Sequence, residues 1–111
     1  MYMKRYEDSE RTFQGVIVQE PKNERVHYYL SRLYMRTRDI PKARSSIDKY
    51  LTFNLDNETR GYALYQKGLI DYREANWAAA EAAFSESWRL AKLDRAKKRL
   101  DLVREKRAAG G

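Results

Sequence analysis

The sequence predicts an all-α protein built from antiparallel helices joined by short turns. Good helix-forming residues dominate the 111-residue chain, and only 5 glycines and 2 prolines are present to interrupt a helix. Polar turn signals recur along the chain, and part of the pattern repeats after 37 residues. The length and the hydrophobic content of 42% fit one buried core, so a single domain over residues 1–111 is expected.

Turn signals in the N-terminal half separate three expected helices. The first helix ends before Pro21, and the segment Arg38-Asp39-Ile40-Pro41 separates the second from the third. Pro41 suits the first turn of a helix, because a missing N–H leaves no hydrogen bond unmade there. Asp39 stands where an N-cap is expected. These signals predict helices over residues 4–19, 24–37 and 41–53.

Similar signals divide the C-terminal half. The polar stretch from Asn54 to Asn57 follows the third helix, and Ala75-Asn76-Trp77 forms the next turn, with Asn76 in the N-cap position. All the connections are short, so consecutive helices should pack antiparallel. Helices are therefore expected over residues 58–74, 77–91 and 94–107.

Two of the expected hairpins are related by an offset of 37 residues. The aligned pairs include Asp39 with Asn76, Ala43 with Ala80, Tyr28 with Tyr65, and Ile47 with Phe84. In stacked hairpins the two helices of a repeat cross closely at one place, where a large side chain would separate the backbones. Ala43 and Ala80 are expected at that crossing, with Ile47 and Phe84 one turn further along the same helix face.

These residues resemble the tetratricopeptide repeat, a pair of helices with the pattern W-x2-L-G-x2-Y, then A-x3-F and a closing Pro, over 34 residues. The matching residues are Leu30, Tyr34, Ala43 and Ile47 in the first full repeat, and Gly68, Ala80 and Phe84 in the second. Pro21 occupies the closing position of a leading half repeat. Lys67 and Asp71 depart from the pattern, and their i, i+4 spacing would let them pair on the helix surface.

The resemblance implies a right-handed superhelix of helical hairpins. About two and a half tetratricopeptide repeats are expected: a half repeat over residues 1–23 and full repeats over residues 24–57 and 58–91. A basic capping helix over residues 92–107 would close the open end. Proteins of this family are scaffolds that bind peptides or other proteins on a concave surface lined by the first helix of each pair.

The sequence contains no motif that would carry catalysis. It has 1 histidine and no cysteine, and neither a GxxxxGK phosphate loop nor an HExxH zinc motif is present. His27 is expected to be a packing residue. We therefore expect a protein that is not an enzyme and that holds no cofactor and no metal. The sequence also has no apolar run of the ~20 residues that a membrane span needs and no signal-peptide core, which favours the cytoplasm.

A stripe of tyrosine and arginine side chains is the candidate binding surface. Spacings of i, i+4, i+7 and i+8 place such residues on one face of helix 24–37 and again on helix 58–74. The candidate partner-binding residues are Tyr28, Arg32, Met35, Arg36, Tyr62, Tyr65, Leu69, Tyr72 and Arg73. Tyrosine and arginine are enriched at binding hot spots, and Arg36 and Arg73 would hold a carboxylate or a phosphate. The alternative is that the tyrosines pack between adjacent repeats and the arginines are only solvated.

The basic character belongs mainly to the last expected helix. The net charge is +7, of which residues 92–107 contribute +5 and residues 1–91 only +2. Leu93, Ala96, Leu100 and Val103 form its expected apolar face, which suits a cap. The basic side chains that crowd the remainder are Lys97, Lys98, Arg99, Arg104, Lys106 and Arg107. Nucleic acid is disfavoured as a partner because this helix has no aromatic residue for stacking on bases.

The N-terminal segment suggests a second function. The expected helix 4–19 lacks the first helix of its pair, so apolar residues on it would be left without part of their cover. Residues 1–34 would then mediate assembly into a homo-oligomer, while the basic helix contacts an acidic surface. The candidate self-association residues are Tyr6, Phe13, Val16 and Ile17.

Overall fold

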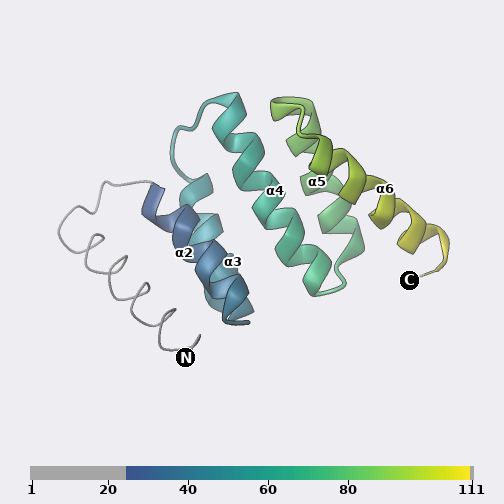
Figure 1. The fold of residues 1–111 in the computed structure, drawn as a ribbon, viewed down its shortest axis with the longest axis horizontal. Coiled ribbons are helices and arrows are strands. Elements are labelled where there is room, and N and C mark those ends of the chain that lie inside the picture. The colour runs from purple at the N-terminus through teal and green to yellow at the C-terminus, as the bar shows by residue number, and fades with distance from the viewer. Residues whose placement is uncertain (1–24, 111) are drawn as a thin grey trace. The chain divides into compact units, whose positions relative to one another are not determined.

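The computed structural model of the protein describes residues 25–110, and the regular secondary structure of this part is entirely helical (Figure 1). Its helices are α2 (Arg25–Arg36), α3 (Ile40–Leu51), α4 (Asn57–Arg73), α5 (Trp77–Ala91) and α6 (Asp94–Ala108). The predicted all-α class is confirmed, and the predicted helix ends differ from the observed ones by at most two residues. None of these helices has the length and apolarity to cross a membrane.

The expected half repeat over residues 1–23, including the first expected helix over residues 4–19, lies outside the described residues. The same holds for the candidate self-association residues Tyr6, Phe13, Val16 and Ile17. Self-assembly through these residues therefore stays a prediction from the sequence.

Residue contacts divide the chain into two compact units. The N-terminal unit extends to Phe53 and contains α2 and α3, and the C-terminal unit begins at Asn54 and contains α4, α5 and α6. The boundary falls at the polar stretch that the sequence predicts as a turn. Within the units, α2 packs on α3, α4 on α5, and α5 on α6.

The turn between α2 and α3 is closed by backbone and side-chain hydrogen bonds. Arg38 adopts a left-handed conformation with a φ of 63°, and the Asp39 N–H donates to the Tyr34 carbonyl at 2.8 Å. The Asp39 side chain accepts a hydrogen bond from the Lys42 N–H at 3.3 Å, which confirms the predicted N-cap. Pro41 lies in the first turn of α3, as predicted.

The turn between α4 and α5 has the same backbone geometry, displaced by 37 residues. Ala75 has a φ of 57°, and the Asn76 N–H donates to the Asp71 carbonyl at 2.8 Å. This bond corresponds to the Asp39–Tyr34 bond of the first turn, and such bonds satisfy carbonyls that a helix end leaves without partners. Asn76 occupies the N-cap position of α5 as predicted, but its side chain makes no capping hydrogen bond.

The interior of the N-terminal unit contains small and branched side chains where α2 meets α3. Ala43 and Ile47 are fully buried, and Ser31 is buried beside them. The Ser31 hydroxyl donates to the Ala43 carbonyl at 2.9 Å, so a polar group satisfies a buried backbone acceptor between the two helices.

In the C-terminal unit, α4 approaches α5 closely at two glycines. A Cβ on Gly68 would lie 2.6 Å from a ring carbon of Phe84, and a Cβ on Gly61 would overlap the Ala91 side chain. The Ser87 hydroxyl donates to the Gly61 carbonyl at 2.6 Å. The absence of side chains at positions 61 and 68 therefore sets how closely the two helices pack.

The apolar face of α6 packs on α5. Ala80 and Phe84 of α5 form one buried cluster with Leu100 and Val103 of α6, and Ala96 of α6 is also buried. The predicted apolar face is correct at Ala96, Leu100 and Val103. The remaining predicted member, Leu93, lies just before the helix at its N-cap position.

One detail of α4 differs from the prediction. Asp71 is only 1% exposed and so does not lie on the surface, where a pair with Lys67 was expected. It follows Gly68 by three residues and therefore lies beside the side of α4 that packs on Phe84 of α5. The position that carries tyrosine in the repeat pattern thus holds a buried carboxyl group in this chain.

Candidate functional site

The predicted binding residues lie on α2 and on α4, which belong to different units, and each set forms part of its own unit. We call the α2 residues Tyr28, Arg32, Met35 and Arg36 the α2 face. The α4 face comprises Tyr62, Tyr65, Leu69, Tyr72 and Arg73.

The α2 face combines a half-buried tyrosine with exposed arginines. The Arg32 guanidinium carbon lies 5.9 Å from the centroid of the Tyr28 ring, which itself contacts Tyr50 of α3 at a centroid separation of 5.7 Å. Met35 is half-buried, and Arg36 is exposed. Within residues 25–110, neither Arg32 nor Arg36 makes an ion pair.

The α4 face contributes to packing as well as to the surface. Tyr65, Leu69 and Tyr72 are half-buried and pack against the cluster formed by α5 and α6. Tyr62 is half-buried too, whereas Arg73 is exposed. The tyrosines of this face are therefore held in place by the core of the C-terminal unit, and only part of each side chain remains available to a partner.

Two tyrosines of the α4 face each contact an aromatic ring of α5 and a guanidinium of α6. Tyr65 lies 5.6 Å from Phe84 between ring centroids, and the Arg95 guanidinium carbon lies 5.1 Å from the Tyr65 centroid. Tyr72 lies 5.1 Å from Trp77, and Arg99 lies 5.6 Å from the Tyr72 centroid. These distances are within the range of cation–π contacts.

Arg95 and Arg99 of α6 contact the α4 face, and neither was among the predicted partner-binding residues. Arg95 also lies 5.5 Å from the centroid of Tyr62, so it contacts two rings of the α4 face. Within the part of the chain that the structure describes, neither arginine makes an ion pair. Helical spacing places Lys106 in the same row of α6, so the sequence alone does not separate these two arginines from the other basic residues.

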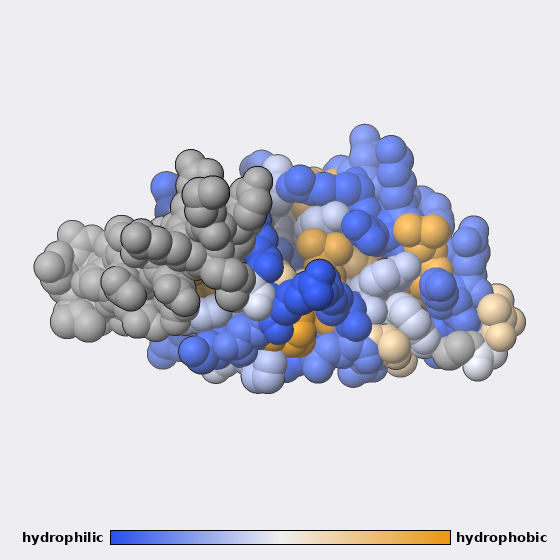
Figure 2. All heavy atoms as spheres, turned by 60° about the horizontal axis from the view of Figure 1, so that its bottom comes forward, coloured by the Kyte–Doolittle hydropathy of each residue, from blue (hydrophilic) through white to orange (hydrophobic). Residues whose placement is uncertain are grey.

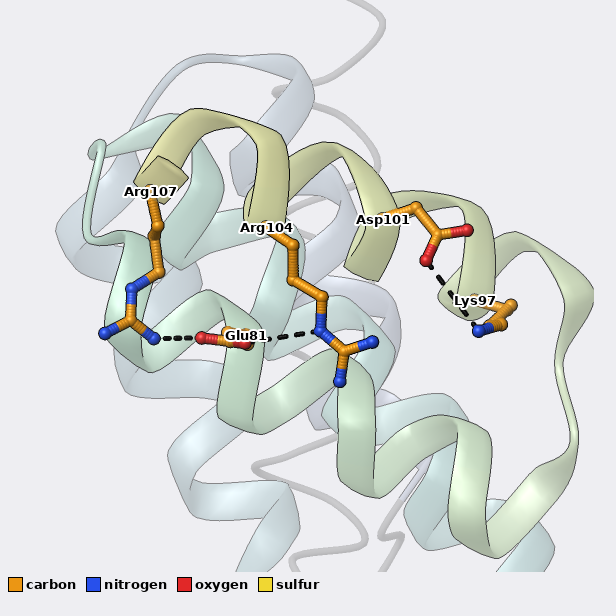
Figure 3. A network of polar contacts seen from close by, with 5 residues as sticks. All are labelled: Glu81, Lys97, Asp101, Arg104 and Arg107. Carbon is orange, nitrogen blue, oxygen red and sulfur yellow. Dashed lines mark hydrogen bonds and ion pairs between the residues drawn. The ribbon is translucent and has the colours of Figure 1, made fainter. Parts of the chain in front are cut away.

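On the opposite side of α6, ion pairs offset part of the positive charge. Glu81 of α5 accepts a hydrogen bond from the Arg104 Nε at 3.4 Å and another from Arg107 (Figure 3). The hydrogen bond from Arg107 lowers the pKa of Glu81, and the bond from Arg104 adds to this effect. Lys97 pairs with Asp101 along α6 at 3.7 Å. The basic residues of α6 are thus divided into a paired side and an unpaired side.

Figure 2 shows that the described surface in that view is mainly hydrophilic, with hydrophobic residues in small separate patches. Tyr29 at 45% and Leu102 at 42% are the large hydrophobic residues with high exposure among residues 25–110. Exposed apolar area this scattered is ordinary for a protein surface. The arginines that lie over tyrosine rings therefore distinguish this surface more than any apolar patch does.

His27 occupies the packing position that the sequence predicts. It is 8% exposed, and its ring stacks on Phe53 with a centroid separation of 5.7 Å and an interplanar angle of 24°. Burial lowers the pKa of His27, and the charge of Lys49 lowers it further. Among the described residues, no group of three or more His, Cys, Asp or Glu side chains is arranged to hold a metal ion.

The architecture of residues 25–110 defines an all-helical protein built on helical hairpins, with tyrosine and arginine side chains on one face of α2 and of α4. The chain matches no protein-family model and no curated protein sequence. The tetratricopeptide resemblance therefore remains a prediction from the residues themselves.

Proposed function

We propose that the protein is a non-catalytic adaptor of the tetratricopeptide type, which binds a protein or peptide partner carrying an acidic group. One observation carries this proposal: both units contain arginines that lie over tyrosine rings at cation–π distance and make no ion pair within residues 25–110. Arg32 lies over Tyr28 in the N-terminal unit, and Arg95 and Arg99 lie over tyrosines of α4 in the C-terminal unit.

Contact with a ring prepares an arginine for binding. The ring restricts the motion of the guanidinium, so less side-chain entropy is lost when a ligand arrives. A guanidinium that contacts a ring by a cation–π interaction still has N–H groups for another partner. Those groups can form paired hydrogen bonds with a carboxylate. Tyrosine beside arginine is also the composition that binding hot spots favour.

The proposal is tested by affinity capture from a nuclease-treated lysate with four proteins. One variant changes the α2 face, Arg32→Gln with Arg36→Gln, and a second changes the two arginines of α6 that lie over the α4 face, Arg95→Gln with Arg99→Gln; these are the two face variants. A third variant, Arg104→Gln with Arg107→Gln, removes the same charge from arginines that already pair with Glu81. Glutamine has a helix propensity close to that of arginine, so circular dichroism should show unchanged helicity.

We expect at least one partner to be retained by the original chain and by the Arg104/Arg107 variant, but lost from one of the two face variants. Identical partners on all four proteins would contradict the proposal, because the faces would then have no role in recognition. Loss from all three variants alike would indicate that only the total positive charge matters.

A further inference from the structure

We infer that the C-terminal unit binds an acidic peptide segment on the surface where α6 lies beside the tyrosines of α4, and that Arg95 and Arg99 hold its carboxylates. We call this the Arg95/Arg99 surface, and it comprises Tyr62, Tyr65, Tyr72, Arg95 and Arg99. The inference rests on the proposed function and names the chemistry of the partner. It also gives α6 a role in recognition besides that of a cap.

The charge on α6 is segregated by side. Positions 95, 99, 102 and 106 follow an i, i+4, i+7, i+11 spacing and so form one row along the helix. This row holds Arg95, Arg99, Leu102 and Lys106, with no carboxylate. The acidic residues Asp101 and Glu105 belong to other rows, and Glu81 of α5 pairs with Arg104 and Arg107 and offsets part of their charge.

Acidic residues do occur at the N-terminal ends of α4 and α6. Glu58 and Asp94 lie in the first turns of α4 and α6, where a negative charge interacts favourably with the helix dipole. Neither makes an ion pair with Arg95 or Arg99. The row of positive charge along α6 therefore lacks counter-charges from the described residues, and an acidic ligand would supply them.

The tyrosines hold both guanidinium groups in place. Arg95 lies over Tyr62 and Tyr65, and Arg99 lies over Tyr72, with all three distances between 5.1 and 5.6 Å. The rings of Tyr65 and Tyr72 are in turn supported by Phe84 and Trp77. Residues of α5 thus hold the tyrosines, and the tyrosines hold the guanidinium groups. This arrangement is expected where binding residues are already positioned before a ligand arrives.

The spacing of the arginines predicts the spacing of acidic residues in the ligand. Four residues along α6 correspond to an axial distance of about 6 Å. Alternate residues of an extended peptide point to one side about 6.5 Å apart, and i, i+4 residues of a helix also lie about 6 Å apart. An extended segment with glutamate at alternate positions is therefore the simplest match.

A peptide suits this surface better than a nucleic acid does. Single-stranded nucleic acids gain affinity when their bases stack on open aromatic rings. Here the rings of Tyr65 and Tyr72 are already engaged by an aromatic ring of α5 and by a guanidinium of α6. What the surface offers is guanidinium N–H groups, which bind carboxylates without any need for stacking.

The test uses the purified full chain and fluorescent peptides in anisotropy titrations at about 0.15 M salt, where long-range attraction is largely screened. One 12-residue peptide alternates glutamate with serine, and its control replaces each glutamate by glutamine. We expect the acidic peptide to bind and the control peptide not to bind. Arg95→Gln with Arg99→Gln should weaken binding about tenfold or more, and Arg104→Gln with Arg107→Gln less than about threefold.

A lysine variant separates geometry from charge. Arg95→Lys with Arg99→Lys keeps both positive charges but removes the planar guanidinium group, which can form paired hydrogen bonds with a carboxylate. We expect it to bind the acidic peptide more weakly than the original chain does. Equal binding by this variant would overturn the role assigned to the guanidinium groups over the tyrosine rings. Melting curves show that each variant is folded before it is titrated.

Three further outcomes would overturn the inference. They are equal weakening by the two glutamine variants, absence of binding to the acidic peptide, and tighter Arg95- and Arg99-dependent binding of a single-stranded RNA of the same length. The proposed function and this inference can be contradicted independently of each other. A lysate partner that is lost with Arg32→Gln and Arg36→Gln would keep the adaptor proposal even if no acidic peptide binds the C-terminal unit.

Discussion

His27 should make the stability of the protein depend on pH. Burial and Lys49 lower the pKa of this histidine from 6.5 in the folded state, so the unfolded chain takes up a proton more readily. The contribution of His27 to the free energy of unfolding is fully present above pH 6.5. It is lost as the pH falls below 6.5 toward the pKa of His27 in the folded state. We expect the melting temperature to fall between pH 7.5 and pH 5.5.

The test is a series of melting curves over that range for the original chain and for His27→Phe. The sequence contains one histidine, and phenylalanine retains a ring that can stack on Phe53 without titrating. The lowered pKa values of Asp56, Glu81 and Glu86 affect stability only in more acidic solution. An unchanged pH dependence in the variant would show that another group is responsible.

Ala75 carries a conformational cost that glycine would remove. It ends α4 with a φ of 57°, and this left-handed conformation costs a residue with a side chain about 1 kcal/mol. We expect Ala75→Gly to raise the free energy of unfolding by about 0.5 kcal/mol, since the greater freedom of glycine in the unfolded chain offsets part of the gain.

Urea denaturation measures this change, and Ala82→Gly is the matched control. Ala82 is exposed in the middle of α5, where glycine should lower the free energy of unfolding by about 1 kcal/mol. Destabilisation of similar size at both positions would contradict the interpretation of Ala75.

At the scale of elements, the contact between α4 and α5 depends on Gly68. Alanine normally favours a helix over glycine, but a Cβ here would lie 2.6 Å from the Phe84 ring. We expect Gly68→Ala to lower the free energy of unfolding by about 1–3 kcal/mol through overpacking.

A double-mutant cycle with Phe84→Leu checks the cause. The smaller side chain would leave space for the added methyl group, so Gly68→Ala should cost less in that background. Additive effects of the two substitutions would show that the ring does not limit the space at position 68.

The helices were predictable because their ends carry local signals. Asp39, Pro41 and the polar stretch before α4 mark boundaries through backbone chemistry that acts within a few residues. The left-handed turns were not predictable in the same way. They contain Arg38 and Ala75, and neither residue type signals a positive φ as glycine does.

The candidate site was predictable only in part. Helical spacing is sufficient to place Tyr65 and Tyr72 on one face of α4. The positions of Arg95 and Arg99 over these rings depend on how α6 packs across the hairpin of α4 and α5, and spacing along one helix carries no information about that packing. The burial of Asp71 was missed for the same reason, since it depends on a contact between helices.

At the scale of the whole molecule, the net charge of +7 should make stability depend on salt. Charges of one sign repel one another through the protein and solvent, and salt screens this repulsion. We expect the melting temperature to rise as the salt concentration increases from about 0.01 M, where the screening length is about 30 Å, to about 0.1 M, where it is about 10 Å.

Melting curves at several concentrations of sodium chloride measure this dependence. A fall in the melting temperature would mean that favourable pairs, such as those of Glu81 with Arg104 and Arg107, outweigh the general repulsion. The Arg95→Gln, Arg99→Gln variant has a lower net charge and keeps those pairs, so its melting temperature should rise less with salt.

In both hairpins a serine hydroxyl donates a hydrogen bond to a backbone carbonyl of the other helix, but the serine lies on opposite helices of the pair. Ser31 donates its hydrogen bond from the first helix of one pair, and Ser87 donates from the second helix of the other. At the offset of 37 residues, Ser31 corresponds to Gly68, whose missing side chain admits the Phe84 ring. A chimera joining α2 to α5 would bring Ser31 against that ring, and one joining α4 to α3 would contain neither serine. Single helices are therefore not interchangeable parts, and a designer who recombines this chain would have to move whole hairpins.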